Sequence, residues 1–187
     1  MKIYYDFRKK LYGGVWEIKS DMPYADISED KNLHLLDLPF RIRHGKKQRD
    51  IIYYFGDISI EFISQNVYAF LSQYEDVSPY LYPIQIMDVD DVYYFVHNLP
   101  EVKFINRNVY ISSTSYKTEI PCFLQQDNLP PFFTLNDTRF KVITPEMKTA
   151  MIKAKITNIA FEPVYGVSSM EEYYQLQKEG KLLPEKG

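Results

Sequence analysis

The sequence predicts an α+β fold, a mixed and mostly antiparallel sheet with about three helices. Short apolar runs are separated by turns rich in Gly, Pro, Asn and Asp, which is typical of strands joined by turns. Hydrophobic residues make up 45% and charged residues 25% of the 187 residues, as in ordinary globular proteins. This length suits one domain spanning residues 1–187, in which residues 1–50 are less regular.

The first half of the chain contains several strand-like segments. Residues 2–7 and 15–19 are predicted to be short strands around a Gly-Gly turn. Residues 20–50 are irregular and polar. Residues 53–63 are predicted to form one half-buried strand, because apolar and polar residues alternate from Asp57 to Phe62.

A helix is expected to follow, beginning at the capping residue Ser64 and continuing to about Glu75. Its apolar face would consist of Val67, Phe70, Leu71 and Tyr74. The apolar runs 83–87 and 92–97 are joined by residues 88–91, three of which are aspartates. This arrangement predicts a β-hairpin with an acidic tip.

The second half ends in two helices. Short strands are expected around 102–105, 108–112, 119–124 and 139–143. Thr144 caps a helix with Pro145 at its first position, and its inward face would consist of Met147, Ala150, Met151 and Ala154. A strand over 156–161 is expected to stop at Pro163. Ser168 or Ser169 caps the last helix, which ends before Gly180.

Aromatic residues are unusually numerous, with 17 Tyr and 12 Phe against a single Trp. Several occur as doublets, at 4–5, 53–55, 93–95, 132–133 and 173–174. Neighbours in a strand point to opposite faces, so a doublet is expected to place one ring in the core and one outward. Outward rings gathered on one surface would favour a binding protein over a catalyst.

The charge pattern argues against a general nucleic-acid-binding protein, since the formal net charge is −3. The only basic concentration is 41–49, where Phe40, Tyr53 and Tyr54 are near enough in sequence to stack bases. A solvated loop is the favoured interpretation of this run. The lone Cys122 lies in an apolar setting, which predicts a buried structural thiol and excludes an internal disulfide.

No pattern in the chain predicts a metal, a cofactor or an enzyme. Asp88, Asp90 and Asp91 fail the calcium-loop pattern because Tyr93 stands where glycine is required, so a solvated turn explains them. The histidines, His34, His44 and His97, belong to no catalytic motif. Distant residues that converge in the fold remain an open alternative.

Neither a secretion signal nor a membrane span is expected. Asp6 and a basic run from Arg8 to Lys10 interrupt the N-terminus before an apolar core of a signal peptide can form. No window approaches the roughly 18 apolar residues that a membrane-spanning helix needs. The sequence therefore predicts a cytoplasmic protein.

Three stretches together resemble a known family. They are Ile58-Ser-Ile-Glu-Phe-Ile-Ser64, Tyr82-Pro-Ile-Gln-Ile86 with the Tyr93-containing strand, and Ile143-Thr-Pro-Glu-Met147 through Thr157-Asn-Ile-Ala-Phe-Glu-Pro163. Over roughly residues 50–165 the chain resembles the bacterial family of predicted immunity proteins first described from a Myxococcus protein, encoded beside polymorphic toxins. Asn158 stands where that family usually has glycine, and asparagine also tolerates a left-handed backbone.

The resemblance implies an α+β cytoplasmic protein that binds a cognate toxin domain encoded by a neighbouring gene and neutralises it without catalysis. The residues favoured for toxin binding are Asp88, Asp90, Asp91 and Tyr93, as an acidic plug for a basic groove. The alternatives are a small enzyme that reverses a toxin's modification, with a pocket lined by a histidine, and a nucleic-acid-binding module using 41–49. A homodimer is left open.

Overall fold

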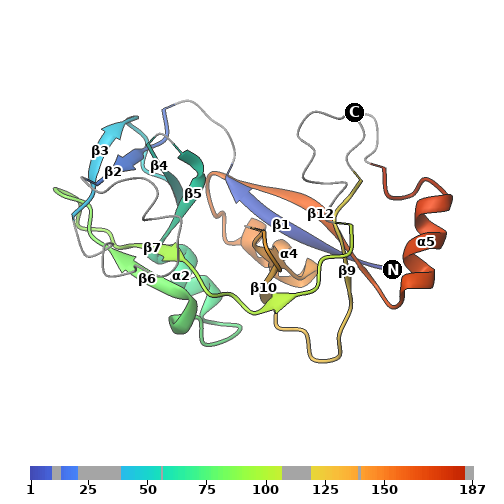
Figure 1. Ribbon diagram of the computed structural model, residues 1–187. Coiled ribbons are helices and arrows are strands. Elements are labelled where there is room, and N and C mark those ends of the chain that lie inside the picture. The colour runs from blue at the N-terminus through green and yellow to red at the C-terminus, as the bar shows by residue number, and fades with distance from the viewer. Residues whose placement is uncertain (10–13, 21–38, 56, 107–118, 139, 184–187) are drawn as a thin grey trace. The chain divides into compact units, whose positions relative to one another are not determined.

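The computed structural model describes residues 1–9, 14–20, 39–55, 57–106, 119–138 and 140–183 (Figure 1). Three α-helices, a short 3-10 helix and twelve strands lie in this part of the chain. The strands form two six-stranded sheets whose pairings are mixed and mostly antiparallel. The predicted α+β class is therefore confirmed.

The chain divides into two compact units. Unit 1 comprises Met1–Arg8, Pro100–Ala150 and Phe161–Gly187, and unit 2 comprises Lys9–Leu99 and Met151–Ala160. Each unit has its own sheet and its own buried cluster. The sequence predicted one mixed sheet, whereas the structure has two.

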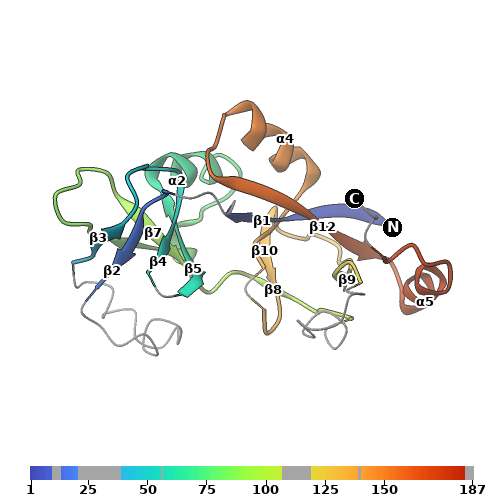
Figure 2. The ribbon, with the colours of Figure 1, turned by 90° about the horizontal axis from the view of Figure 1, so that it is seen from above.

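The sheet of unit 1 has the strand order β8-β10-β11-β1-β12-β9. Its strands are β1 (Lys2–Lys9), β8 (Glu101–Val102), β9 (Cys122–Leu124), β10 (Phe132–Leu135), β11 (Val142–Ile143) and β12 (Ile159–Val167). Figure 2 shows β1 and β12, which are neighbours in the sheet, side by side. Tyr4 packs edge-on against Phe123 with 5.0 Å between ring centroids. A Cβ at Gly166 would lie 2.8 Å from the Tyr4 ring, so this close approach requires glycine.

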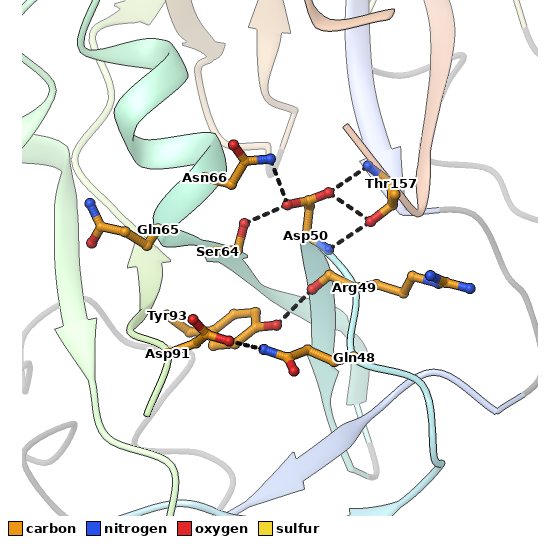
Figure 3. A pocket seen from close by; sticks show the side chains of 9 residues that line it. All are labelled: Gln48, Arg49, Asp50, Ser64, Gln65, Asn66, Asp91, Tyr93 and Thr157. Carbon is orange, nitrogen blue, oxygen red and sulfur yellow. Dashed lines mark hydrogen bonds between the residues drawn. The ribbon is translucent and has the colours of Figure 1, made fainter. Parts of the chain in front are cut away.

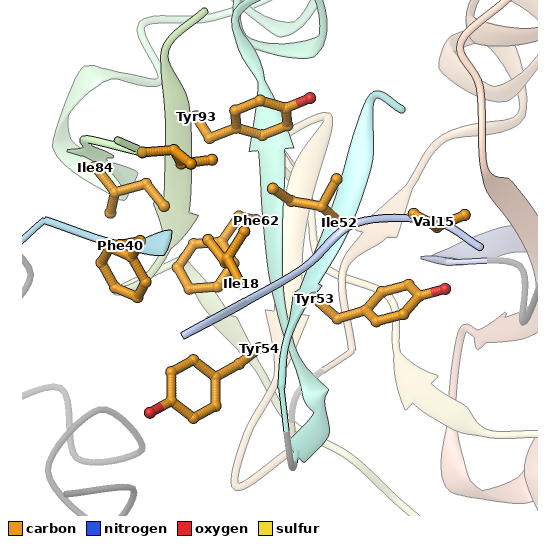
Figure 4. Packing of buried hydrophobic residues seen from close by; sticks show 10 residues of the cluster. Val15, Ile18, Phe40, Ile52, Tyr53, Tyr54, Phe62, Ile84 and Tyr93 are labelled. Atoms are coloured by element: carbon orange, nitrogen blue, oxygen red, sulfur yellow. The ribbon is translucent and has the colours of Figure 1, made fainter. Parts of the chain in front are cut away.

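The sheet of unit 2 has the order β3-β2-β4-β5-β7-β6. Its strands are β2 (Glu17–Lys19), β3 (Arg41–His44), β4 (Ile51–Tyr54), β5 (Asp57–Ser64), β6 (Leu81–Ile84) and β7 (Tyr93–Val96), and the 3-10 helix η2 spans Ser78–Tyr80. Phe40, just before β3, forms a bridge with Ile86, just after β6. Because these residues flank the two outermost strands, the sheet curls round its core, part of which Figure 4 shows.

The predicted strand over 53–63 was wrong, because this segment belongs to two strands. β4 and β5 pair in antiparallel fashion, with Tyr54 opposite Asp57. The expected alternation fails too, since Phe62 and Ile63 are both fully buried and Glu61 is 8% exposed. β5 lies between β4 and β7 in the sheet, so both of its edges are paired, and helix α2 (Gln65–Leu71) packs beside it.

The helix caps are as predicted. The Ser64 hydroxyl accepts from the N–H of Val67 at the start of α2. α2 ends at Leu71, earlier than the expected Glu75. Helix α4 spans Pro145–Lys153, and the Thr144 hydroxyl accepts from Met147 N–H. Helix α5 spans Met170–Lys178, with Ser169 as its cap. These caps are local contacts three residues apart, which a sequence pattern can predict.

The strand expected over 156–161 was only partly right. Strand β12 does not stop at Pro163 but continues to Val167. Its parallel pairing with β9 begins at Tyr165, so Pro163 lies where no N–H is needed for this neighbour. Strand β10 was not predicted, and the strand expected at 108–112 lies outside the described residues.

The aromatic doublets follow the expected in-and-out rule in some strands only. Tyr4 is buried while Tyr5 is partly exposed, and Tyr93 is buried while Tyr94 is partly exposed. The rings of Tyr53 and Tyr54 are both buried, as are those of Phe132 and Phe133. Both faces of these strands are covered, so these rings serve as packing residues.

Candidate functional site

The predicted hairpin with an acidic tip is confirmed, since β6 and β7 pair with Ile84 opposite Tyr93. We refer to residues 85–92, which join the two strands, as the acidic connection. Asp88, Asp90 and Asp91 on it are all exposed. The structure therefore brings three of the four residues favoured for toxin binding together on one exposed segment.

Tyr93, the fourth of these residues, lies in the core. Its side chain is 1% exposed and packs in the buried cluster of unit 2. Its hydroxyl donates to the backbone carbonyl of Arg49 at 2.8 Å. Burial raises the pKa of Tyr93 to about 12; Gln48 opposes this shift, and the carboxylates of Asp50 and Asp91 add to it. This tyrosine positions the start of β7 and offers no exposed ring to a partner.

Backbone hydrogen bonds hold the acidic connection in place. The N–H of Phe40 donates to Gln85 at 2.8 Å, and the N–H of Met87 donates to Phe40 at 2.8 Å. The Gln48 side chain donates to the Asp91 carboxylate. Asp88 has a left-handed backbone with φ 61°, which aspartate tolerates better than most residues. The connection is thus an ordered segment tied to the chain on either side of β3.

Two large apolar side chains are exposed among these carboxylates. Met87 is 42% exposed and Val92 is 39% exposed. Apolar side chains surrounded by charged ones are the usual composition of a binding surface, with a dry centre and a polar rim. Neither of these two residues was predicted from the sequence to belong to the site, whereas the aspartates were.

A polar pocket of about 210 Å³ adjoins the acidic connection (Figure 3). Its lining residues are Gln48, Arg49, Asp50, Ser64, Gln65, Asn66, Asp91, Tyr93 and Thr157. All of them belong to unit 2. Sequence reasoning did not find this pocket, because its residues come from four separate segments of the chain.

Asp50 is the most highly coordinated group in the pocket. Its carboxylate accepts hydrogen bonds from Thr157 N–H at 2.7 Å, the Thr157 hydroxyl at 2.6 Å, the Ser64 hydroxyl at 2.8 Å and the Asn66 amide at 3.1 Å. Partial burial raises the pKa of Asp50, but these bonds outweigh burial and the net pKa is lowered. The carboxylate is therefore ionised and already accepts four hydrogen bonds, so it acts as a structural anchor.

No described histidine lines the pocket. Among the described histidines, exposed His44 lies on β3 and His97 follows β7, and neither lines the pocket. His34 lies outside the described residues. Within the described part of the chain, no group of three His, Cys, Asp or Glu side chains is placed to hold a metal ion.

The lone cysteine is buried, as predicted. Burial, and to a lesser degree the nearby Glu119 carboxylate, raise the pKa of the Cys122 thiol to about 12. Because the thiolate is the reactive form, this cysteine is inert in the folded protein.

The basic run is exposed, but the aromatic residues expected beside it are not. Every residue from Arg41 to His44 is exposed. Phe40, Tyr53 and Tyr54 are at most 4% exposed, so the alternative in which these rings stack bases draws no support from the structure. The exposed aromatic ring nearby is that of Phe55, over which Arg43 lies at 6.0 Å.

The described helices are too short or too polar to cross a membrane. Comparison of the chain with known protein families, with curated proteins and with solved structures finds no match.

Proposed function

We propose that this chain is a cytoplasmic immunity protein that binds a cognate toxin domain and covers its active site or substrate groove. The observation that carries the proposal is the acidic connection, an ordered segment that exposes three carboxylates beside Met87 and Val92. A toxin that acts on nucleic acid or nucleotides needs a basic groove, and this segment has the complementary charge.

The mechanism requires no bond to be made or broken. Long-range attraction between the carboxylates and a basic groove speeds encounter. Burial of Met87 and Val92 then supplies apolar contact area. Because backbone bonds to Phe40 already fix the connection, little conformational entropy is lost on binding.

The alternative, an enzyme that reverses the toxin's modification, draws no support from the described pocket. That pocket contains no histidine, and its central carboxylate is occupied by four donors. The two functions differ in stoichiometry. A covering inhibitor must match the toxin mole for mole, whereas an enzyme protects at substoichiometric amounts.

The proposal is tested by co-expression with the product of the neighbouring gene. We expect that product to inhibit growth, and this chain to restore growth and co-purify with it at 1:1 stoichiometry. Titration of the purified chain into a toxin assay then measures the equivalence point. Protection at a small fraction of one equivalent would contradict the covering mechanism.

The surface is tested by the pair Asp88→Lys with Asp90→Lys. We expect Kd for the toxin to rise by about tenfold or more, with the larger part of the loss in the association rate. Lysine tolerates the left-handed backbone at Asp88, since Lys155 has φ 58° in this same chain. The matched control is Glu101→Lys with Asp127→Lys, which makes the same charge change at exposed residues of unit 1. If both variants lost the same affinity for the toxin, the acidic connection would not be part of the binding site.

A further inference from the structure

A second charged surface of unit 2 lies next to the acidic connection. We refer to residues 40–49 as the basic segment. Its cationic side chains are all exposed: Arg41, Arg43, Lys46, Lys47 and Arg49. None of them forms an ion pair with another described residue. Within the described part of the chain, no carboxylate neutralises the positive charge of this segment.

Backbone hydrogen bonds also hold the basic segment in place. The N–H groups of Lys46 and Lys47 both donate to Gly14, at 2.9 and 2.8 Å. Between these residues and β3, Gly45 has φ 85°, and a Cβ there would lie 2.1 Å from the Val15 carbonyl oxygen. Only glycine fits this turn, so the chain presents its cations from a defined backbone.

The two charged segments are neighbours. Phe40, at the start of the basic segment, exchanges backbone bonds with Gln85 and Met87, and Gln48 near its end bonds Asp91. Figures 1 and 2 both show β3 and the loop between β6 and β7 at the same end of unit 2. Unit 2 thus carries a positive strip beside a negative strip, and no described ion pair joins them.

We infer that this surface pairs with the same surface of a second copy of the chain. A two-fold axis between two such surfaces places the acidic connection of each copy over the basic segment of the other. Every contact then occurs twice and both are attractive. Ile42, Met87 and Val92, which are 38%, 42% and 39% exposed, supply apolar area within the charged surface.

The charges also select against the simplest alternative dimer. β3 is an outermost strand of its sheet, and two such edges could pair directly. Antiparallel pairing of β3 with its copy would bring Arg41 and Arg43 of the two chains close together, and like charges across a strand pair repel. The crossed arrangement, in which each basic segment meets an acidic connection, avoids this repulsion.

The dimer covers the acidic connection. One further step rests on the proposed function. If the chain binds a toxin through the acidic connection, the dimer is inactive toward the toxin, and the toxin must displace the second copy. Toxin and second copy then compete for Asp88 and Asp90. The dimer itself does not depend on the toxin and is tested without it.

Sedimentation equilibrium of the full chain tests the pairing. We expect a monomer–dimer equilibrium near 50 mM salt that shifts to monomer near about 500 mM, since salt screens attraction between exposed charges. A protein that is monomeric at every concentration and salt would overturn the inference. A dimer insensitive to salt would overturn it equally, because its contacts would not be charge pairs.

Charge reversal gives the sharper test. We expect Asp88→Lys with Asp90→Lys, and separately Arg41→Glu with Arg43→Glu, each to weaken self-association by about tenfold or more. Mixing the two variants should restore pairing as a 1:1 heterodimer, because reversed acidic and reversed basic surfaces attract again. Variants that failed to pair because they were misfolded would not associate when mixed. Failure of the mixture to associate, with both variants folded by circular dichroism, would overturn the proposal.

The matched control is again Glu101→Lys with Asp127→Lys, which should dimerise like the parent chain. The Arg41→Glu, Arg43→Glu variant separates the two proposals, because it keeps the acidic connection. As a monomer it should bind toxin at least as tightly as the parent chain. If it pairs with the reversed acidic variant but neither it nor the parent chain binds toxin, the dimer stands and the proposed function fails.

Discussion

Asp6 in unit 1 and Asp50 in unit 2 are carboxylates whose pKa values shift in opposite directions. Asp6 is 1% exposed and accepts from Lys141 N–H at 2.7 Å and from Arg8. Burial outweighs these partners and raises the pKa of Asp6 to about 6. Asp50 is half-buried, and its four donors lower its pKa in spite of burial.

The charge state of each carboxylate follows from the balance between its burial and the hydrogen bonds that it accepts. Asp6 is deeply buried and accepts few hydrogen bonds, so burial favours its neutral form. Asp50 accepts four hydrogen bonds, which favour its ionised form. Unit 1 therefore keeps a titratable group in its interior. Unit 2 fixes its carboxylate at the edge of a pocket, where the group ties separate segments together.

The largest effect is expected from Asp50→Ala. It removes the acceptor of four hydrogen bonds, so the free energy of unfolding of unit 2 should fall by about 3 to 4 kcal/mol. The single tryptophan, Trp16, packs against the core of unit 2, so its fluorescence during urea denaturation reports the unfolding of this unit.

Asn66→Ala is the graded control for this experiment. It removes a single 3.1 Å bond to the same carboxylate and should cost about 1 kcal/mol. If Asp50→Ala cost no more than Asn66→Ala, the anchor role of Asp50 would be wrong.

A smaller effect is expected from the titration of Asp6. Its folded pKa of about 6 is above the ordinary aspartate pKa of 3.8, so folding binds a proton between these pH values. The stability this gives unit 1 is fully present below about pH 4 and is lost as pH rises through about 6, by roughly 2 to 3 kcal/mol. Asp50 has the opposite sign, and its contribution is lost as the pH falls below about 4.

Cys122 lies in unit 1 and allows this unit to be followed separately. Its buried thiol should react with a thiol reagent only after unit 1 opens. Short labelling pulses at one fixed pH, after equilibration in urea at different pH values, then give the fraction unfolded. The Asp6→Asn variant should lose the pH dependence between 4 and 6. If stability still changes with pH in the same way in Asp6→Asn, another group causes the pH dependence.

The smallest effect is expected from Asn158→Gly. Asn158 has φ 59°, where glycine relieves about 1 kcal/mol of strain. The substitution also removes the 2.7 Å bond from the Asn158 amide to the carbonyl of Ile51, which contributes a similar amount. The two changes should cancel to within about 1 kcal/mol. Asn158→Ala, which loses the bond and keeps the strain, should be the less stable variant in the Trp16 measurement.

The sequence predicts local features of this molecule and misses the distant ones. The caps at Ser64, Thr144 and Ser169 were predictable because donor and acceptor are three residues apart. The hairpin and the exposure of Asp88, Asp90 and Asp91 followed from local turn chemistry.

The anchor at Asp50 gives no such local signal, because its partner Thr157 lies 107 residues further along the chain. Alternation also failed where the sheet curls, since Tyr53 and Tyr54 are buried on both faces of one strand. Tyr93 was predicted to bind the toxin together with the aspartates, but its ring is buried. Val92 just before it is exposed, whereas the ring of Tyr93 points into the core of unit 2.

Thr157 and Asn158 are synthesised long after the rest of the unit to which they belong. Both belong to unit 2, but unit 2 otherwise ends at Leu99. A ribosome must therefore translate more than fifty further residues before Asp50 can meet its donor and Ile51 can receive the Asn158 amide. Until then the emerging chain holds an unfinished unit, and contacts so distant in sequence form slowly.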